Sequence, residues 1–377
     1  MNNINIMMKI LFLIENLWAG GKERRFVQLL TYLNTIKEIY LGIIITEKDI
    51  FYDQIKKTNI PIYIIERKTR YDPTLFYKIF QVVNEFKPDV IHSWGIMTTI
   101  YSIPSKILFK KPLVGSIIAD AEGIFAMPRQ KRLLFYLCCL FSDLILSNSE
   151  AGLIAYNLKS NRKSRVIYNG IDLGRFFINK NKDEIKKKYG INTPYLIIMV
   201  ASASKKKNYD LFFDIAKEIS LKRKDITFLG IGNGQEFDRL KKKIFNEKIE
   251  NANLIQARPN IEEIMYASDI GILFSENEGI SNSVAEYMAC GLPVISTDVS
   301  GGTKEIIENC KSGYIFRKED KELIINKILE LIDNKAIRIE LGKRGAEIIK
   351  DRFSLEFSGM KYLNLYVELI NKKSRNG

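Results

Sequence analysis

Histidine, cysteine and proline are scarce in this sequence, and each shortage excludes a class of protein. Because His92 is the only histidine, a histidine-rich zinc site is ruled out. The four cysteines show neither the spacing of metal ligands nor the density of a disulfide scaffold, so we expect reduced, structural thiols. With 9 prolines and 46% hydrophobic residues, the chain is neither collagen-like nor disordered, and a globular class is predicted.

Long hydrophobic runs are also missing. No apolar stretch approaches the roughly 20 residues that cross a bilayer. The first apolar run, Ile10 to Ile14, ends at Glu15 without a small-residue cleavage site, so it predicts a buried strand and not a signal peptide. We therefore expect a cytoplasmic protein.

Positive charge is in excess, with 58 Lys and Arg against 44 Asp and Glu and a net charge of +14. A field of this size attracts anionic partners such as nucleic acids, anionic membranes or phosphorylated small molecules. A general lysine-rich residue usage is an equally good explanation. The chain lacks interleaved aromatic and basic residues, zinc-finger spacing and an evident recognition helix, so we expect no nucleic-acid partner.

Short apolar runs rich in β-branched residues alternate with amphipathic helical stretches. This alternation is typical of βα units that form parallel sheets. Because 377 residues exceed one typical domain, we predict an α/β protein of two facing Rossmann-like, doubly wound domains, with ligands bound in the cleft between them. The predicted strands lie at 9–14, 39–45, 61–65, 89–93, 112–117, 143–147, 164–168, 195–201, 226–231, 253–256, 269–274, 292–296 and 313–316.

The best linker begins at Asn169 and runs to Asp183, because it combines Asn-Gly turn chemistry with polar and charged residues. We accordingly predict an N-terminal domain over 1–172 and a C-terminal domain over 173–355. Apolar residues at helical spacing near the end predict a terminal helix, assigned to 356–377, that packs on one or both domains.

A strand, a tight loop and a helix are predicted in order between residues 269 and 290. The cap-forming residues Ser281, Asn282 and Ser283 predict a helix start whose free N–H groups can bind phosphate. Glu278 and Glu286 flank this helix start and could contact a donor-sugar hydroxyl and a ribose diol. Alternatively, Ser283 and Glu286 form a capping box, which would engage the second carboxylate with the backbone.

With this strand, loop and helix, followed by Gly291-Leu292-Pro293-Val294, the chain resembles the retaining glycosyltransferases of family four, which have the two-domain GT-B fold. In that family two glutamates with the same separation occupy this setting, and Glu278 and Glu286 match them. Further segments that match in order are Gly20-Gly21-Lys22-Glu23, Pro88-Asp89-Val90-Ile91-His92, Ser147-Asn148-Ser149, Tyr168-Asn169-Gly170-Ile171-Asp172, Gly230-Ile231-Gly232-Asn233-Gly234, Ala267-Ser268-Asp269 and Thr297-Asp298-Val299-Ser300-Gly301-Gly302 with Glu305.

The resemblance implies an acceptor-binding N-terminal domain and a nucleotide-sugar-binding C-terminal domain. It implies catalytic roles for Glu278, Lys207 and His92. The implied donor-binding residues are Gly20, Gly21, Ser202, Lys207, Gly232, Arg258, Glu278, Gly279, Ile280, Ser281, Asn282, Ser283 and Glu286. No metal or other cofactor is expected, because helix N–H groups and a lysine can stabilise the leaving diphosphate.

Two positions depart from the family pattern. Ser202 stands where an arginine is usual, five residues before Lys207, so phosphate binding could be weaker or shared with the neighbouring lysines. Trp94 stands where many members have a second histidine, which makes a catalytic His92 less secure. A solvated lysine run and a structural histidine are the alternatives for Lys207 and His92.

The segment 129–141 begins with three basic residues and continues as an apolar run. A helix of this kind can lie in an anionic membrane interface. Because no polar face remains for water, we favour a buried core helix and keep peripheral contact with the inner membrane face as the alternative.

The resemblance implies transfer of a sugar, with retention of configuration, from a nucleotide diphosphate donor to a glycan or lipid-linked acceptor. A UDP-linked donor and a role in cell-surface polysaccharide synthesis, such as capsule or lipopolysaccharide, are favoured. The departures at Ser202 and Trp94 leave a second hypothesis, a non-catalytic partner of another transferase.

Overall fold

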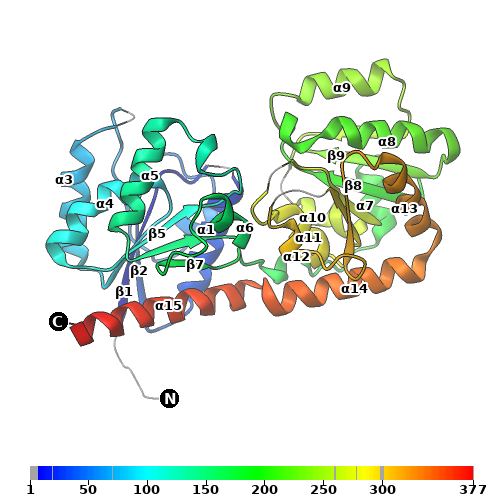
Figure 1. Cartoon of the computed structure of the whole chain (residues 1–377). Coiled ribbons are helices and arrows are strands. Elements are labelled where there is room, and N and C mark those ends of the chain that lie inside the picture. Colours follow the sequence, from blue (N-terminus) through cyan, green and yellow to red (C-terminus); the bar gives the residue numbers. More distant parts are fainter. Residues whose placement is uncertain are drawn as a thin grey trace. The chain divides into compact units, whose positions relative to one another are not determined.

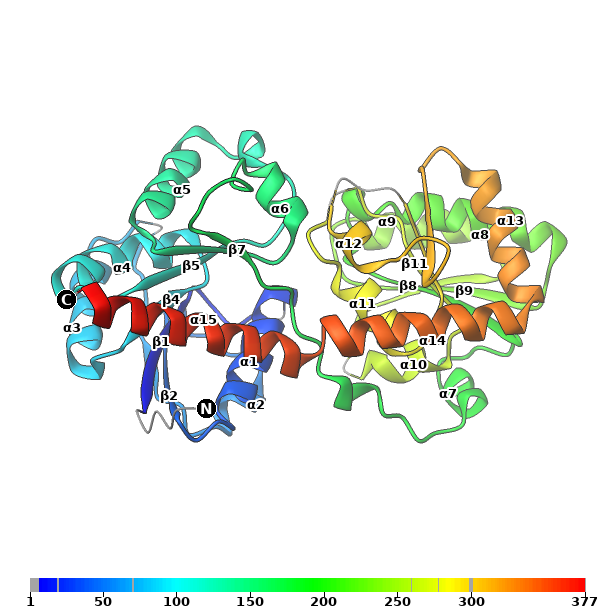
Figure 2. The ribbon, with the colours of Figure 1, turned by 60° about the horizontal axis from the view of Figure 1, so that its bottom comes forward.

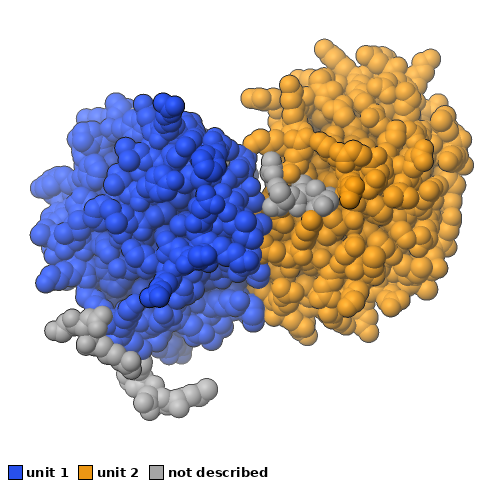
Figure 3. Space-filling model, viewed as in Figure 1, with its two compact units in different colours: residues 1–170, 355–377 blue, residues 171–354 orange. Residues whose placement is uncertain are grey.

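The computed structural model describes residues 7–18, 20–69, 71–258, 260–276, 278–297 and 301–376. The chain divides into two compact units (Figure 3). Unit 1 contains Met1–Gly170 and Leu355–Gly377, and unit 2 contains Ile171–Ser354. The boundary thus falls two residues before the predicted one, and the last helix belongs to unit 1.

Unit 1 is built on a parallel sheet with the order β3-β2-β1-β4-β5-β6-β7 among the described residues (Figure 1). The strands are β1 (Met8–Ile14), β2 (Ile39–Ile45), β3 (Ile62–Ile64), β4 (Val90–Ser93), β5 (Leu113–Ile118), β6 (Leu144–Ser147) and β7 (Ser164–Val166). The helices are α1 (Gly21–Leu33), α2 (Asp53–Lys56), α3 (Thr74–Phe86), α4 (Ile96–Phe109), the 3-10 turn η1 (Ile124–Ala126), α5 (Arg129–Phe141), α6 (Glu150–Ala155) and α15 (Leu355–Asn376).

Unit 2 repeats the plan with a parallel sheet of order β10-β9-β8-β11-β12-β13 in its described part. Its strands are β8 (Tyr195–Val200), β9 (Ile226–Ile231), β10 (Ala252–Ile255), β11 (Ile270–Leu273), β12 (Val294–Thr297) and β13 (Gly313–Phe316). Its helices are η2 (Leu173–Phe176, 3-10), α7 (Lys182–Lys188), η3 (Lys205–Lys207, 3-10), α8 (Tyr209–Lys222), α9 (Phe237–Asn246), α10 (Ile261–Ala267), α11 (Asn282–Ala289), α12 (Thr303–Ile306), α13 (Lys321–Asp333) and α14 (Lys335–Arg352).

Every strand predicted from the sequence is present, with ends within two residues of the expected positions. The runs are recognisable because a parallel strand is buried on both faces and so reads as a continuous apolar segment. In β1, for example, every residue except Lys9 is buried. The predicted α/β class with two doubly wound sheets is confirmed.

The strand orders place a topological switch point in each unit. In unit 1 it lies between β1 and β4, and in unit 2 between β8 and β11. Chain connections leave these neighbouring strands in opposite directions, so a crevice forms at their carboxyl ends, where ligands of such sheets bind. The loops after β8 and β11 carry Lys207 and Glu278, respectively.

The last helix, α15, packs on unit 1 beside α1 (Figure 2). Tyr362, Leu365, Tyr366 and Leu369 on its inner face join the same buried cluster as Phe12 of β1. The terminal helix predicted from apolar spacing is confirmed, and its hydrophobic face accounts for its attachment to this unit.

The predicted linker 169–183 contains the boundary between the units, but it is not simply extended. Ile171 pairs with Ser354, and its N–H donates to the Phe353 carbonyl at 2.8 Å. Asp172 caps η2 by accepting from the Gly174 N–H at 3.0 Å. The Asn-Gly-Ile-Asp segment therefore fixes the start of unit 2.

Candidate active site

The ion pair between Lys207 and Glu278 joins the two loops at the switch point of unit 2. Lys207 ends η3, and its ammonium also donates to the Ser275 hydroxyl at 3.3 Å. The backbones are tied as well, since the Glu276 N–H donates to the Lys206 carbonyl at 2.8 Å. The two paired side chains are 21% and 16% exposed, so both remain open to a ligand.

The helix α11 begins at Asn282, beside this pair, and Ser281 is its N-cap. The Ser281 hydroxyl accepts from the Val284 N–H at 3.4 Å. Ser283 lies inside the first turn, and its hydroxyl donates to the Val200 carbonyl at 2.6 Å. The alternative capping box of Ser283 and Glu286 is therefore wrong, because Ser283 is not the cap.

Glu286 is nearly fully buried, at 1% exposed. Its carboxylate lies 3.7 Å from the Arg175 guanidinium, which also forms an ion pair with Glu262 of α10. Arg175, which contacts the predicted site residue Glu286, was not predicted from the sequence. The available signal was its position three residues after Asp172 of the Asn-Gly-Ile-Asp segment. The ribose contact predicted for Glu286 stays a prediction, since in this conformation its carboxylate faces the interior of unit 2.

The loop after β9 closes against the loop after β8. A Cβ added at Gly232 would overlap the Ala201 carbonyl oxygen, so only glycine allows this approach. The Ala203 N–H donates to the Asn233 carbonyl at 2.9 Å. Ser202, in the same β8 loop, is exposed and lies within hydrogen-bond distance of Ser204, with 3.2 Å between the hydroxyls.

Arg258 is exposed in the loop after β10. The Ala257 N–H beside it donates to the Asn233 side chain at 3.2 Å, which joins this loop to the β9 loop. The carboxyl edge of unit 2 thus brings Ser202, Gly232 and Arg258 onto connected loops.

The glycine pair after β12 fixes the backbone of Glu278. The Gly302 N–H donates to the Glu278 carbonyl at 3.1 Å. A Cβ at Gly301 would overlap the same carbonyl oxygen. Gly279 and Ile280 are buried between this turn and the start of α11. Asp298, Val299 and Ser300 of the matching motif lie outside the described residues.

In unit 1, Gly20 and Gly21 lie at the start of α1, where Gly20 is the N-cap. The Gly20 N–H donates to the Tyr52 hydroxyl at 3.1 Å, and that hydroxyl donates to the Gly20 carbonyl at 2.8 Å. Gly21 is exposed, so its backbone is accessible at the carboxyl end of β1.

His92 is not accessible in this conformation, which favours the structural alternative; its predicted catalytic role stays a prediction. The side chain is fully buried in β4. Its Nδ1 lies 2.7 Å from the Tyr366 hydroxyl, and its Nε2 lies 2.7 Å from the Ser116 hydroxyl. Burial lowers the pKa of His92 to about 3, so the ring is neutral. His92 connects the sheet to α15, which is a structural role.

A cavity of about 400 Å³ opens at the carboxyl edge of the unit 1 sheet. It is lined by Glu15 after β1, Gly95 after β4 and Asp120 after β5. Asp120 accepts from the Tyr156 hydroxyl at 2.8 Å. Lys22 and Lys131 add positive charge to the same wall. A cavity with donors and acceptors around its rim can hold a polyhydroxylated ligand.

In the described part of the chain, no group of three or more His, Cys, Asp and Glu side chains is arranged to hold a metal ion. All four cysteines are free thiols. Burial raises the pKa of Cys138, Cys139 and Cys290 to about 12, so these thiols stay protonated.

The prediction that 129–141 is a buried core helix is wrong. Within α5 the side chains buried are those of Phe135 and Cys138, whereas Leu133, Tyr136 and Leu140 are 63%, 55% and 66% exposed. A helix without an obvious polar face was expected to be covered on all sides, but unit 1 covers one side. Separately, no helix among the described residues is long and apolar enough to cross a bilayer.

Part of the chain is similar to a known protein family. Residues 181–348 match the family model of glycosyl transferases group 1. An N-acetyl-alpha-D-glucosaminyl L-malate synthase from Bacillus anthracis is 28% identical over 58% of this chain and 57% of its own length. An uncharacterized glycosyltransferase from Methanocaldococcus jannaschii is 26% identical over 76% of this chain and 87% of its own length.

Among solved structures, the Anabaena protein HepE in complex with UDP superposes with a TM-score of 0.84. It is 19% identical and covers 96% of this chain and 100% of its own. A likeness at this identity establishes the fold, which is GT-B. The two sheet orders and this likeness thus give the chain the GT-B fold, and residues 181–348, within unit 2, are similar to glycosyl transferases group 1.

Proposed function

We propose that this glycosyltransferase transfers a sugar from a nucleotide diphosphate donor to a glycan or lipid-linked acceptor, with retention of the anomeric configuration. The observation that carries the proposal is the Lys207–Glu278 pair beside the start of α11. It combines an ammonium, a carboxylate and backbone N–H groups at the carboxyl edge where doubly wound sheets bind ligands.

In this proposal the donor breaks the ion pair and binds to both of its members. The diphosphate takes the Lys207 ammonium, because phosphate oxygens are strong acceptors for a cation. Glu278 is then released to accept hydrogen bonds from the hydroxyls of the donor sugar. The same contacts hold the negative charge that develops on the leaving diphosphate, which lowers the barrier to bond cleavage.

Retention follows if the acceptor attacks from the face that the diphosphate leaves. The acceptor hydroxyl then gives its proton to the departing diphosphate oxygen through an oxocarbenium-like state. Glu278 is the accessible carboxylate closest to Lys207, but its pairing favours a binding role over that of a covalent nucleophile. No metal is needed, since Lys207 and the N–H groups near Asn282 supply the stabilising charge.

We assign the donor to unit 2 and the acceptor to the cavity of unit 1 lined by Glu15 and Asp120. A UDP-linked donor is the favoured choice, supported by the UDP complex of HepE. A role in cell-surface polysaccharide synthesis is supported by relatives such as a capsular polysaccharide glycosyltransferase of Staphylococcus aureus, 24% identical over 57% of this chain.

We further propose a cytoplasmic location with peripheral contact on the inner membrane face. The support is the exposed apolar side of α5, where Leu133, Tyr136 and Leu140 follow the basic residues Arg129 and Lys131. Such a surface combines apolar insertion with attraction to anionic headgroups.

The test is a binding screen of the purified protein against UDP-, GDP- and CMP-sugars, followed by NMR of the anomeric proton of any product. We expect UDP-sugar binding, and turnover that persists in EDTA. An inverted product, or complete loss of turnover in EDTA, would contradict the mechanism. A chain that binds no nucleotide sugar and raises the activity of another transferase would instead be a non-catalytic partner.

A further inference from the structure

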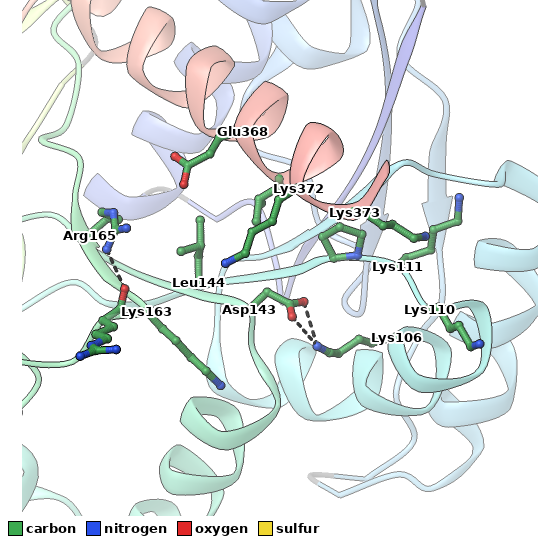
Figure 4. A pocket seen from close by; sticks show the side chains of 13 residues that line it. Lys106, Lys110, Lys111, Asp143, Leu144, Lys163, Arg165, Glu368, Lys372 and Lys373 are labelled. Atoms are coloured by element: carbon green, nitrogen blue, oxygen red, sulfur yellow. Dashed lines mark hydrogen bonds and ion pairs between the residues drawn. The ribbon is translucent and has the colours of Figure 1, made fainter. Parts of the chain in front are cut away.

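A basic pocket of about 470 Å³ lies at the amino-terminal edge of the unit 1 sheet. Figure 4 shows the side chains that line it. It is formed where β5, β6 and β7 begin, against the end of α4 and the last turns of α15. We call it the amino-edge pocket. Its lining residues are Lys106, Lys110, Lys111, Pro112, Asp143, Leu144, Arg162, Lys163, Arg165, Glu368, Leu369, Lys372 and Lys373.

Positive charge dominates this lining, with eight lysine and arginine side chains against two carboxylates. Asp143 is already engaged, because both of its oxygens accept from the Lys106 ammonium at 2.8 Å. Its Oδ2 also accepts from the Leu113 N–H at 2.8 Å. Glu368 is therefore the one lining carboxylate that forms no ion pair among the described residues.

Most of the lining cations have no acidic partner. In the described part of the chain, no Asp or Glu oxygen lies within ion-pair distance of the ammonium groups of Lys110, Lys111, Lys372 and Lys373. The same is true of the Arg162 guanidinium. Lys163 is held differently, because its ammonium donates to the carbonyls of Leu140 and Ser142 at 3.0 and 3.1 Å. Figure 4 shows Lys163 on one side of Asp143 and Lys110, Lys111 and Lys373 on the other.

The cations also disfavour one another. Burial lowers the pKa of Lys373, and the positive charges of Lys111 and Lys110 lower it further, although the carboxylate of Asp89 acts in the opposite direction. A bound anion would remove this repulsion and supply the missing partner. The pocket is thus arranged for a negatively charged group.

The chemistry of the lining selects phosphate. Lysine ammonium groups and an arginine fork are the usual partners of phosphate oxygens, and several such residues line the pocket from different elements. Exposed apolar residues neighbour the lining: Ile107 and Leu108 follow Lys106 in the sequence and are 57% and 65% exposed, and Leu140, whose carbonyl accepts from the Lys163 ammonium, is 66% exposed. This neighbourhood is compatible with a phosphate that is attached to an apolar group.

We propose that the amino-edge pocket binds a phosphate or diphosphate group, at a site separate from the nucleotide-sugar site of unit 2. The group could belong to a membrane lipid headgroup or to a soluble phosphorylated molecule, and the chemistry is the same for both. The proposal does not depend on the transfer reaction.

The test compares two variants with the same change in charge, at physiological ionic strength so that nonspecific attraction is screened. The pocket variant carries Lys111→Gln, Lys372→Gln and Lys373→Gln. The control carries Lys37→Gln, Lys159→Gln and Lys222→Gln, which are exposed and outside the pocket. Calorimetry with inorganic pyrophosphate should give at least a roughly tenfold weaker affinity at one site for the pocket variant alone. Equal affinities in both variants would overturn the proposal.

A second variant, expected to bind pyrophosphate more tightly, tests the pocket even if the triple pocket variant does not fold. Glu368→Gln removes the unpaired carboxylate, so pyrophosphate should bind several-fold more tightly. No change in affinity would count against the site. Sedimentation with phosphatidylglycerol and phosphatidylcholine vesicles then separates the sources. Loss of phosphatidylglycerol binding in the pocket variant identifies a lipid headgroup, and retained vesicle binding with lost pyrophosphate binding identifies a soluble phosphate.

Discussion

Lys207 and Glu278 neutralise each other across the switch point of unit 2, although they follow different strands. The pair joins the β8 and β11 loops, and in the proposed mechanism the donor diphosphate competes with Glu278 for the lysine. Because the pair is partly exposed, its own contribution to stability is at most about 1 kcal/mol. Its importance lies in the chemistry it positions.

The first prediction concerns this lysine. Lys207→Met removes the cation that stabilises the leaving diphosphate, so kcat/KM should fall by roughly 10²-fold or more in a steady-state assay. The melting temperature should change little. Lys205→Met, in the same 3-10 turn but exposed, is the control and should keep most of the activity. A larger loss of kcat/KM for Lys205→Met than for Lys207→Met would assign the phosphate contact to Lys205.

The second prediction concerns Arg175. Arg175→Gln leaves the buried carboxylates of Glu262 and Glu286 without their cation. Removing one partner of a buried pair costs about 3 kcal/mol or more, so denaturant titration should reveal a destabilised unit 2. UDP binding should weaken, because Glu286 loses its fixed position. Arg175→Lys keeps the positive charge, so it should restore part of the stability and part of the UDP binding. Unchanged UDP binding in Arg175→Gln would show that Glu286 does not contact the donor.

The third prediction is a pH dependence that arises from His92. Its pKa is lowered to about 3 in the folded protein, from about 6.5 when unfolded. The unfolded chain therefore binds more protons between these values, and stability is complete above pH 6.5 and lost as the pH falls. At pH 5 the loss relative to pH 7 should be about 2 kcal/mol.

Since His92 is the only histidine, its C–H resonances in NMR report this titration without assignment ambiguity. They should not shift between pH 7 and 5 in the folded protein. His92→Gln should be less stable at pH 7 and lose much of the pH dependence in this range. A His92 ring that titrates near pH 6.5 in the folded state would contradict the burial.

The fourth prediction uses glycine packing. Gly301→Ala places a methyl group against the Glu278 carbonyl, so the loop that carries this glutamate must move. Activity should fall strongly, while the overall fold persists by circular dichroism. Gly345→Ala in α14 is the matched control, because its added methyl meets neighbours at 3.4 Å or more. Alanine favours a helix, so this control should be active and equally or slightly more stable.

The fold could be predicted from the sequence because buried parallel strands are short, apolar and β-branched. The Lys207 and Glu278 loops could be predicted because each follows such a strand. Their ion pair could not, since it depends on strand order and not on sequence spacing. Arg175 was missed for the same reason, as its partners are on α10 and α11.

The surroundings of His92 and of α5 could not be predicted from the sequence, and the physical reason is the same for both. The side chain of a residue at the end of a strand can face the core or the ligand edge. His92 faces the core, where its ring contacts Tyr366 of α15. An apolar helix can be covered on one side or on all sides. The sequence of α5 alone does not tell which other segments pack against it. In both cases the outcome depends on segments far away in the chain.

The attachment of α15 to unit 1 affects how the chain must fold as it is synthesised. Tyr366 and Leu369 leave the ribosome long after Phe12, yet they complete the cluster around it. Unit 2, whose residues lie between them in the chain, can close while unit 1 still has part of its apolar surface uncovered. Deleting α15 would consequently destabilise the unit whose synthesis begins first.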